Sequence, residues 1–137
     1  MRQALVEANH ALSLDEVPVG AVIVCKNQII ARGHNLTETL TDVTAHAEIQ
    51  AITAAAQYLG AKYLKGCTLY VTLEPCCMCA GALYWSQIDK VVFGARDENR
   101  GASQHEKSLY HPATLVTNGI MEAECQQLLK DFFARKR

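Results

Sequence analysis

The sequence predicts an α/β protein, specifically a three-layer α/β/α sandwich around a five-stranded mixed sheet. Five β-rich apolar runs alternate with segments of helical composition, at residues 19–25, 28–33, 67–73, 90–94 and 113–116. Only Lys26-Asn27 separates the first two runs, so they should form an antiparallel hairpin, which makes the sheet mixed. Half of the 137 residues are hydrophobic, enough for one globular domain spanning residues 1–137.

The N-terminal third should supply one helix and the hairpin. Apolar side chains recur at helical spacing in residues 2–12 and predict an amphipathic helix. In the first strand, Gly20 indicates either a close backbone approach to a ligand or a bulge. His34-Asn35 follows the second strand and opens a polar loop that runs to Asp42.

The remaining elements follow in order. Residues 45–59 are helical in composition and Gly60 can cap them. A buried strand at 67–73 leads into a helix at 76–85, which is followed by the strand at 90–94. The polar stretch 96–111 is too irregular to assign, and a terminal helix should begin at Ile120.

Two short stretches carry metal-binding chemistry, Thr44-Ala45-His46-Ala47-Glu48 and Leu73-Glu74-Pro75-Cys76-Cys77-Met78-Cys79. Each begins a predicted helix, and the second follows a strand. Functional sites in open α/β sheets collect at the carboxyl ends of strands. Both stretches are therefore expected at one rim of the sheet.

Three residues form the predicted metal site: His46, Cys76 and Cys79. Catalytic zinc uses three protein ligands and leaves one position to water, so we expect one zinc per chain. Pro75 suits the first position of a helix, whose N-terminus favours thiolate over thiol. Positions 76 and 79 share a helix face, whereas Cys77 is turned away and should not be a ligand.

Glu48 is assigned the proton transfers. A catalytic zinc can lower the pKa of a bound water from 15.7 to about 7, and a nearby carboxylate can carry the released proton to a leaving group. This combination predicts hydrolysis.

The Cys-x-x-Cys pair by itself also fits a redox pair or half of a structural zinc site. A closed four-thiolate site would need a second such pair, but Cys25, Cys67 and Cys125 stand alone. These three are expected to be small buried apolar residues.

Composition constrains the environment and the partner. No apolar run approaches the roughly 20 residues of a membrane span, and the N-terminus has no signal-peptide pattern, so we expect a soluble cytoplasmic protein with reduced thiols. The net charge of −1 and pI near 6.5 argue against an obvious nucleic-acid binder. Positive charge is concentrated late in the chain, at Arg96, Arg100, Lys107, Arg135, Lys136 and Arg137.

Aromatic residues suggest two further surfaces. Phe132 and Phe133 precede a basic end, a combination that suits stacking on unpaired bases, although one ring could simply pack the helix against the core. Trp85 ends an almost entirely apolar helix, which points to a core or an interface.

The two motifs resemble the signature of the zinc-dependent cytidine deaminase superfamily. Within it, the chain is similar to the bacterial tRNA-specific adenosine deaminases over nearly its full length, in residues 16–22, 44–49, 68–76, 91–97 and 131–133. The resemblance implies that Asn35 contacts the base and that a homodimer forms near residues 83–85. Gln87 departs from the basic residue expected there.

The expected function is zinc-dependent deamination of adenosine to inosine at the wobble position of a tRNA anticodon stem-loop. Asn35 and Phe133 are the candidate substrate-binding residues. The alternative is a deaminase of a free base or nucleoside, namely cytosine, cytidine or guanine, with the same metal site. A different class is a non-enzymatic zinc module or a redox protein.

Overall fold

A five-stranded mixed sheet forms the centre of the computed structural model, which describes all residues from Met1 to Arg137. The elements in chain order are α1 (Arg2–Ser13), β1 (Gly20–Cys25), β2 (Gln28–His34), α2 (Ala47–Leu59), β3 (Cys67–Leu73), α3 (Cys77–Ser86), β4 (Lys90–Ala95), the 3-10 helix η1 (Ala102–Gln104), β5 (Leu115–Thr117) and α4 (Glu122–Arg135). None of these helices has the length and apolarity needed to cross a membrane.

The strand order is β2-β1-β3-β4-β5. Strand β1 is antiparallel to both β2 and β3, whereas β3, β4 and β5 are parallel. The hairpin turn places Lys26 and Asn27 at φ of 52° and 61°, the left-handed conformation that two-residue hairpin turns require. The predicted hairpin and mixed sheet are confirmed.

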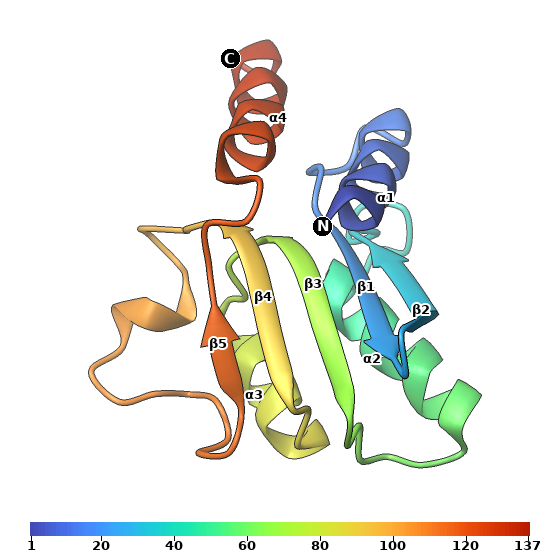
Figure 1. The fold of residues 1–137 in the computed structure, drawn as a ribbon. Helices are drawn as coiled ribbons and strands as arrows, with labels where there is room; N and C mark the ends of the chain where they lie inside the picture. Colours follow the sequence, from blue (N-terminus) through green and yellow to red (C-terminus); the bar gives the residue numbers. More distant parts are fainter.

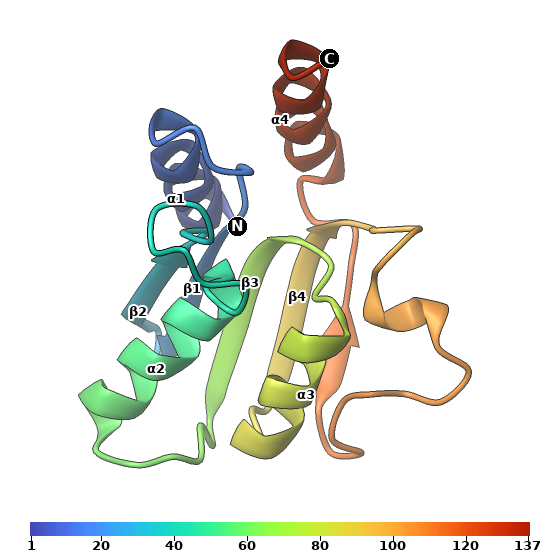
Figure 2. The same ribbon diagram turned by 180° about the vertical axis from the view of Figure 1, so that it is seen from behind.

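Helices cover both faces of the sheet. Helices α2 and α3 pack on one face (Figure 2), while α1 and α4 contact the other, with α4 extending past the end of the sheet (Figure 1). Glycines set the close packing, since a Cβ at Gly20 would overlap the backbone of α1 and a Cβ at Gly33 would overlap that of α2. The three-layer prediction is confirmed. The close approach at Gly20 is made by α1, so the expectation of a ligand or bulge there is wrong.

Several predicted boundaries are wrong by one to two residues, and two of these matter for chemistry. Helix α2 begins at Ala47 and α3 at Cys77, so His46 and Cys76 are N-cap residues with extended backbones rather than helical ones. Pro75 therefore precedes the cap and does not occupy the first helical position. An N-cap side chain projects beyond the end of its helix.

The C-terminal boundaries also shift. Strand β5 covers Leu115–Thr117 instead of 113–116, and β4 extends to Ala95. Helix α4 begins at Glu122 because Gly119 and Met121 both take positive φ values, which interrupt a helix. Part of the unassigned polar stretch forms the short helix η1.

The core lies between the sheet and its helices. Cys67 and Cys125 are buried as predicted, but Cys25 is only half-buried. The end of α3 divides between core and surface, because Leu83 is fully buried whereas the Trp85 side chain is 75% exposed. Trp85 therefore does not belong to the core.

Candidate metal centre and active site

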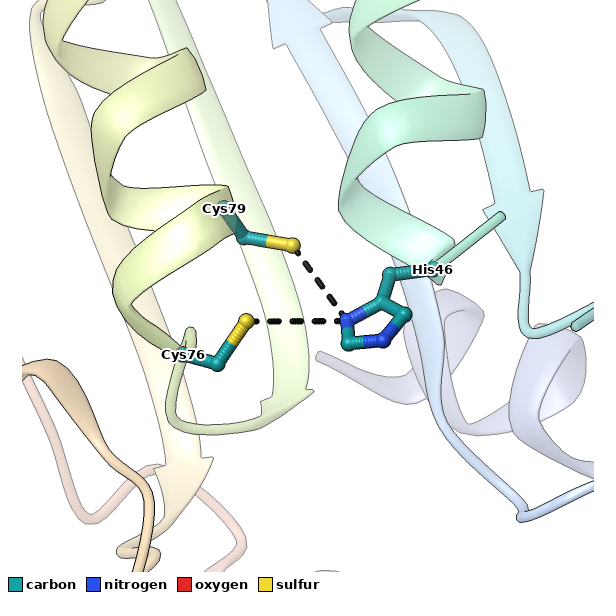
Figure 3. Close-up of side chains that lie close together, drawn as sticks. All are labelled: His46, Cys76 and Cys79. Atoms are coloured by element: carbon teal, nitrogen blue, oxygen red, sulfur yellow. Dashed lines mark hydrogen bonds between the residues drawn. The ribbon is translucent and has the colours of Figure 1, made fainter. Parts of the chain in front are cut away.

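The three predicted ligands meet at the carboxyl end of β3. His46 caps α2, Cys76 caps α3, and Cys79 lies in the first turn of α3. The Nδ1 atom of His46 is 3.7 Å from the Sγ of Cys76 and 3.5 Å from the Sγ of Cys79, and all three side chains point into one space (Figure 3). Cys77 is exposed and stands apart from this group.

This spacing fits zinc. A tetrahedral zinc with bonds of about 2.0 Å to nitrogen and about 2.3 Å to sulfur separates the two donor atoms by roughly 3.5 Å. The observed separations of 3.5 and 3.7 Å are close to that value. A ligand set of one imidazole and two sulfur donors also binds zinc in preference to harder cations.

The electrostatics prepare the donors for a metal. A hydrogen bond from Cys79 lowers the pKa of Cys76 to about 3, against the effect of burial and with further help from His46. Its bond to Cys76, together with burial, raises the pKa of Cys79. Within the pair, the thiolate is therefore favoured at Cys76 over Cys79. Metal binding would release the Cys79 proton.

Glu48 lies two residues after His46, in the first turn of α2, and is only 3% exposed. Burial raises the pKa of its carboxyl above the ordinary value. A carboxylate in such an environment accepts a proton more readily than an exposed one, as proton transfer in catalysis requires.

A cavity of about 900 Å³ opens beside the metal centre. His46, Glu48 and Cys76 line it, as do both substrate-binding candidates, Asn35 and Phe133. These residues come from four separate parts of the chain. The fold thus brings all the predicted site residues except the fully buried Cys79 to one cavity, and the Sγ of Cys79 lies 3.5 Å from the Nδ1 of His46, which lines it.

Asn35 is held firmly at the cavity. It is 7% exposed, its backbone N–H donates to the carbonyl of Val19 at 3.1 Å, and its side-chain oxygen accepts from the N–H of Thr37 at 3.3 Å. The side-chain NH₂ group makes no hydrogen bond within the protein. Asn35 therefore presents two donor hydrogens in a fixed position.

Glu74 belongs to the cysteine-containing motif, but the sequence alone indicated no role for it. Its carboxylate is 3% exposed and accepts hydrogen bonds from the N–H groups of Asp97 at 3.1 Å and Ser103 at 2.9 Å. The loop that carries Arg96 to Arg100 along the cavity is tied in this way to the start of α3. A charged residue directly between an apolar strand and a proline was the available signal.

One face of α4 was also missed. It lines the cavity at helical spacing with Glu122, Gln126, Leu129, Lys130 and Phe133. The sequence predicted a terminal helix here, and of the residues on this face it indicated only Phe133 as a substrate contact. The position of α4 past the end of the sheet makes this face part of the site (Figure 1).

Comparisons with known proteins identify a zinc-binding family. A family model described as the cytidine and deoxycytidylate deaminase zinc-binding region matches residues 1–95. The tRNA-specific adenosine deaminase of Bacillus subtilis (strain 168) is 47% identical over 143 residues, covering all of this chain and 88% of that protein.

Solved structures extend the comparison. One from a study of A-to-I editing by tRNA:A34 deaminases at the wobble position of transfer RNA has a TM-score of 0.88 and 45% identity, covering 94% of this chain and 97% of that one. A guanine deaminase from Bacillus subtilis has a TM-score of 0.66 and 42% identity, covering 69% of this chain and 61% of that one.

Proposed function

The chain belongs to the cytidine and deoxycytidylate deaminase family, and on that premise we propose that it converts adenosine to inosine at the wobble position of a tRNA anticodon loop. One observation carries the choice of substrate. The cavity beside the metal centre continues to α4, where Phe133 is 46% exposed, so it is open to a nucleotide that remains attached to a longer chain. The full-length identity to tRNA-specific relatives supports the same choice.

His46, Cys76 and Cys79 would hold the zinc. When bound, zinc supplies a Lewis acid that makes water a nucleophile at neutral pH. In the overall reaction a C6–O bond forms, the C6–N bond breaks, and ammonia leaves.

Glu48 moves the proton. Its buried carboxylate accepts a proton from the attacking water and delivers it to the departing amino group. The raised pKa of this carboxyl suits this role, because burial makes the carboxylate a stronger base than an exposed glutamate.

Asn35 and Phe133 position the substrate. The free NH₂ group of Asn35 donates to acceptor atoms on the purine edge, while the ring of Phe133 offers a stacking surface for a neighbouring unpaired base. Arg96, Arg100 and Lys130 also line the cavity and supply charge for backbone phosphates.

The assembly proposed is a cytoplasmic homodimer in which residues 1–137 act as one deaminase domain. Exposed aromatic side chains support a dimer, since Tyr84 is 36% exposed and Trp85 is 75% exposed at the end of α3. Their rings contact each other edge-on at a centroid distance of 5.4 Å. Light scattering at micromolar concentration should report twice the chain mass, and Trp85→Ala should shift it toward the monomer. A wild-type monomer would remove the dimer from the proposal.

A substrate panel tests the function. Zinc-loaded protein is incubated with an anticodon stem-loop bearing adenosine at the wobble position, and separately with free adenosine, cytidine, cytosine and guanine, while ammonia and inosine are measured. We expect rapid conversion of the stem-loop alone. Guanine is the critical competitor because of the similarity to a guanine deaminase. Turnover of guanine with no reaction on the stem-loop would refute the proposal.

Asn35→Ala is the matched variant for the panel. It should slow conversion of the stem-loop while zinc content stays at one per chain, because Asn35 is not among the metal donors. Binding of the stem-loop should weaken as salt rises.

A further inference from the structure

A second group of metal-binding side chains lies between α1 and β2, away from the centre described above. It consists of Glu7 and His10 on α1 and His34 at the end of β2. One donor atom from each residue lies within 4.8 Å of the other two. None of these residues lines the active-site cavity.

Both imidazoles approach the same carboxylate oxygen. The Nδ1 of His34 is 3.2 Å from Oε1 of Glu7, and the Nδ1 of His10 is 3.4 Å from the same atom. Two donors at a tetrahedral zinc with bonds of about 2.0 to 2.1 Å are separated by roughly 3.4 Å. The distances from the two Nδ1 atoms to Oε1 of Glu7 therefore already match those expected if all three atoms bound one cation.

The side chains differ in exposure in a way that suits binding. The Glu7 side chain is 7% exposed, whereas that of His10 is 59% exposed and faces solvent. His34, at 23%, is intermediate. A cation can enter from the His10 side and remain in contact with solvent, which supplies its other ligands.

Arg32 orients the carboxylate. Its guanidinium donates to Oε2 of Glu7 at 3.3 Å and to Oε1 of Gln3 at 2.9 Å. The hydrogen bond to Oε2 leaves Oε1 facing the two histidines. Metal-binding carboxylates are commonly held through their second oxygen in this manner.

We infer that Glu7, His10 and His34 form a second, solvent-accessible site for a divalent transition-metal ion of the zinc or nickel type. Two imidazoles and one carboxylate favour such ions over magnesium or calcium, which prefer oxygen donors. The site joins α1 to the end of β2, one residue before Asn35 in the chain. An ion bound there would fasten the N-terminal helix to the strand that leads into the substrate cavity.

The test starts from protein that already holds one zinc per chain. Added zinc chloride is followed by calorimetry, and the ring nitrogens of the five histidines are followed by NMR. We expect a second equivalent to bind, with shifts at His10 and His34. Loss of a hydrogen-bond partner outside the ligands already costs about 10- to 100-fold in affinity. Loss of a ligand in His10→Ala should therefore weaken the second equivalent at least tenfold.

His105→Ala is the matched control, because His105 is an exposed histidine outside the cluster. It should bind the second equivalent like the wild type. The inference is overturned if only one equivalent binds, if His10→Ala retains the second, or if the NMR shifts fall on other histidines. Deaminase activity is not the readout, so the result is independent of the proposed function.

Discussion

Replacing Glu74 by Gln tests whether one buried carboxylate holds the active-site loop. Its two oxygens accept from the N–H groups of Asp97 and Ser103. A glutamine side chain keeps one oxygen acceptor but places an NH₂ group where the second oxygen was. One of the two hydrogen bonds is therefore lost, and the other is made to an uncharged acceptor. A bond to a charged acceptor contributes about 1.5 to 3 kcal/mol, and an unsatisfied buried N–H costs about 1 to 3 kcal/mol. We expect a net loss of roughly 2 to 4 kcal/mol in the stability of the closed loop.

Hydrogen exchange measures this loss directly. A loss of 2 to 4 kcal/mol corresponds to amide exchange at Asp97 and Ser103 that is faster by about 30- to 800-fold. The Michaelis constant for the stem-loop should rise as well, because this loop lines the cavity. Glu98→Gln is the control, since Glu98 lies in the same loop with an exposed side chain. Equal exchange rates in the two variants would refute the reasoning.

Three further predictions concern the metal, the proton and acid stability. Cys76→Ser and Cys79→Ser should each lose zinc in metal analysis, whereas Cys77→Ser should retain it, because the Cys77 side chain is exposed and apart from the donors. Glu48→Ala should keep its zinc and lose about 10²- to 10⁴-fold in turnover, and a variant with near wild-type activity would exclude the proton role. Burial opposes ionisation of Glu16, but N–H donors from Thr39 and Glu38 outweigh it and hold its pKa below the ordinary value of 4.5. A carboxyl whose pKa is lower in the folded than in the unfolded state stabilises the fold above the unfolded-state pKa, and this stabilisation is lost as the pH falls through the folded-state pKa. Between about pH 5 and pH 3 the free energy of unfolding, measured in urea, should therefore fall less in Glu16→Gln than in the wild type.

The features that follow from local spacing could be predicted from the sequence. Apolar periodicity located the helices and strands, and Lys26-Asn27 identified the hairpin that makes the sheet mixed. The donor set also followed from local order, because His46 and Cys76 each stand at the start of a helix and β3 ends just before the cysteines. Helix starts were less certain, since a cap residue and a first helical residue differ only in backbone conformation.

Features that depend on long-range packing could not be predicted. Nothing near Gly20 in the sequence indicates that the backbone of α1 fills the space a side chain would need. The role of Glu74 depends on Asp97 and Ser103, which lie more than 20 residues away. The cavity face of α4 likewise exists only because α4 extends past the end of the sheet.

The formal net charge argued against a nucleic-acid partner because it gives buried and exposed carboxylates the same weight. Four of the 14 acidic residues, Glu7, Glu16, Glu48 and Glu74, are buried, whereas no Lys or Arg is. Glu7, Glu16 and Glu74 accept hydrogen bonds from donors within the protein. Over the whole molecule, the side chains that are not buried therefore comprise 13 basic and ten acidic ones. A formal charge of −1 thus coexists with a small excess of accessible basic side chains, and the salt dependence of stem-loop binding tests whether basic residues of the cavity such as Arg96, Arg100 and Lys130 contact the phosphates.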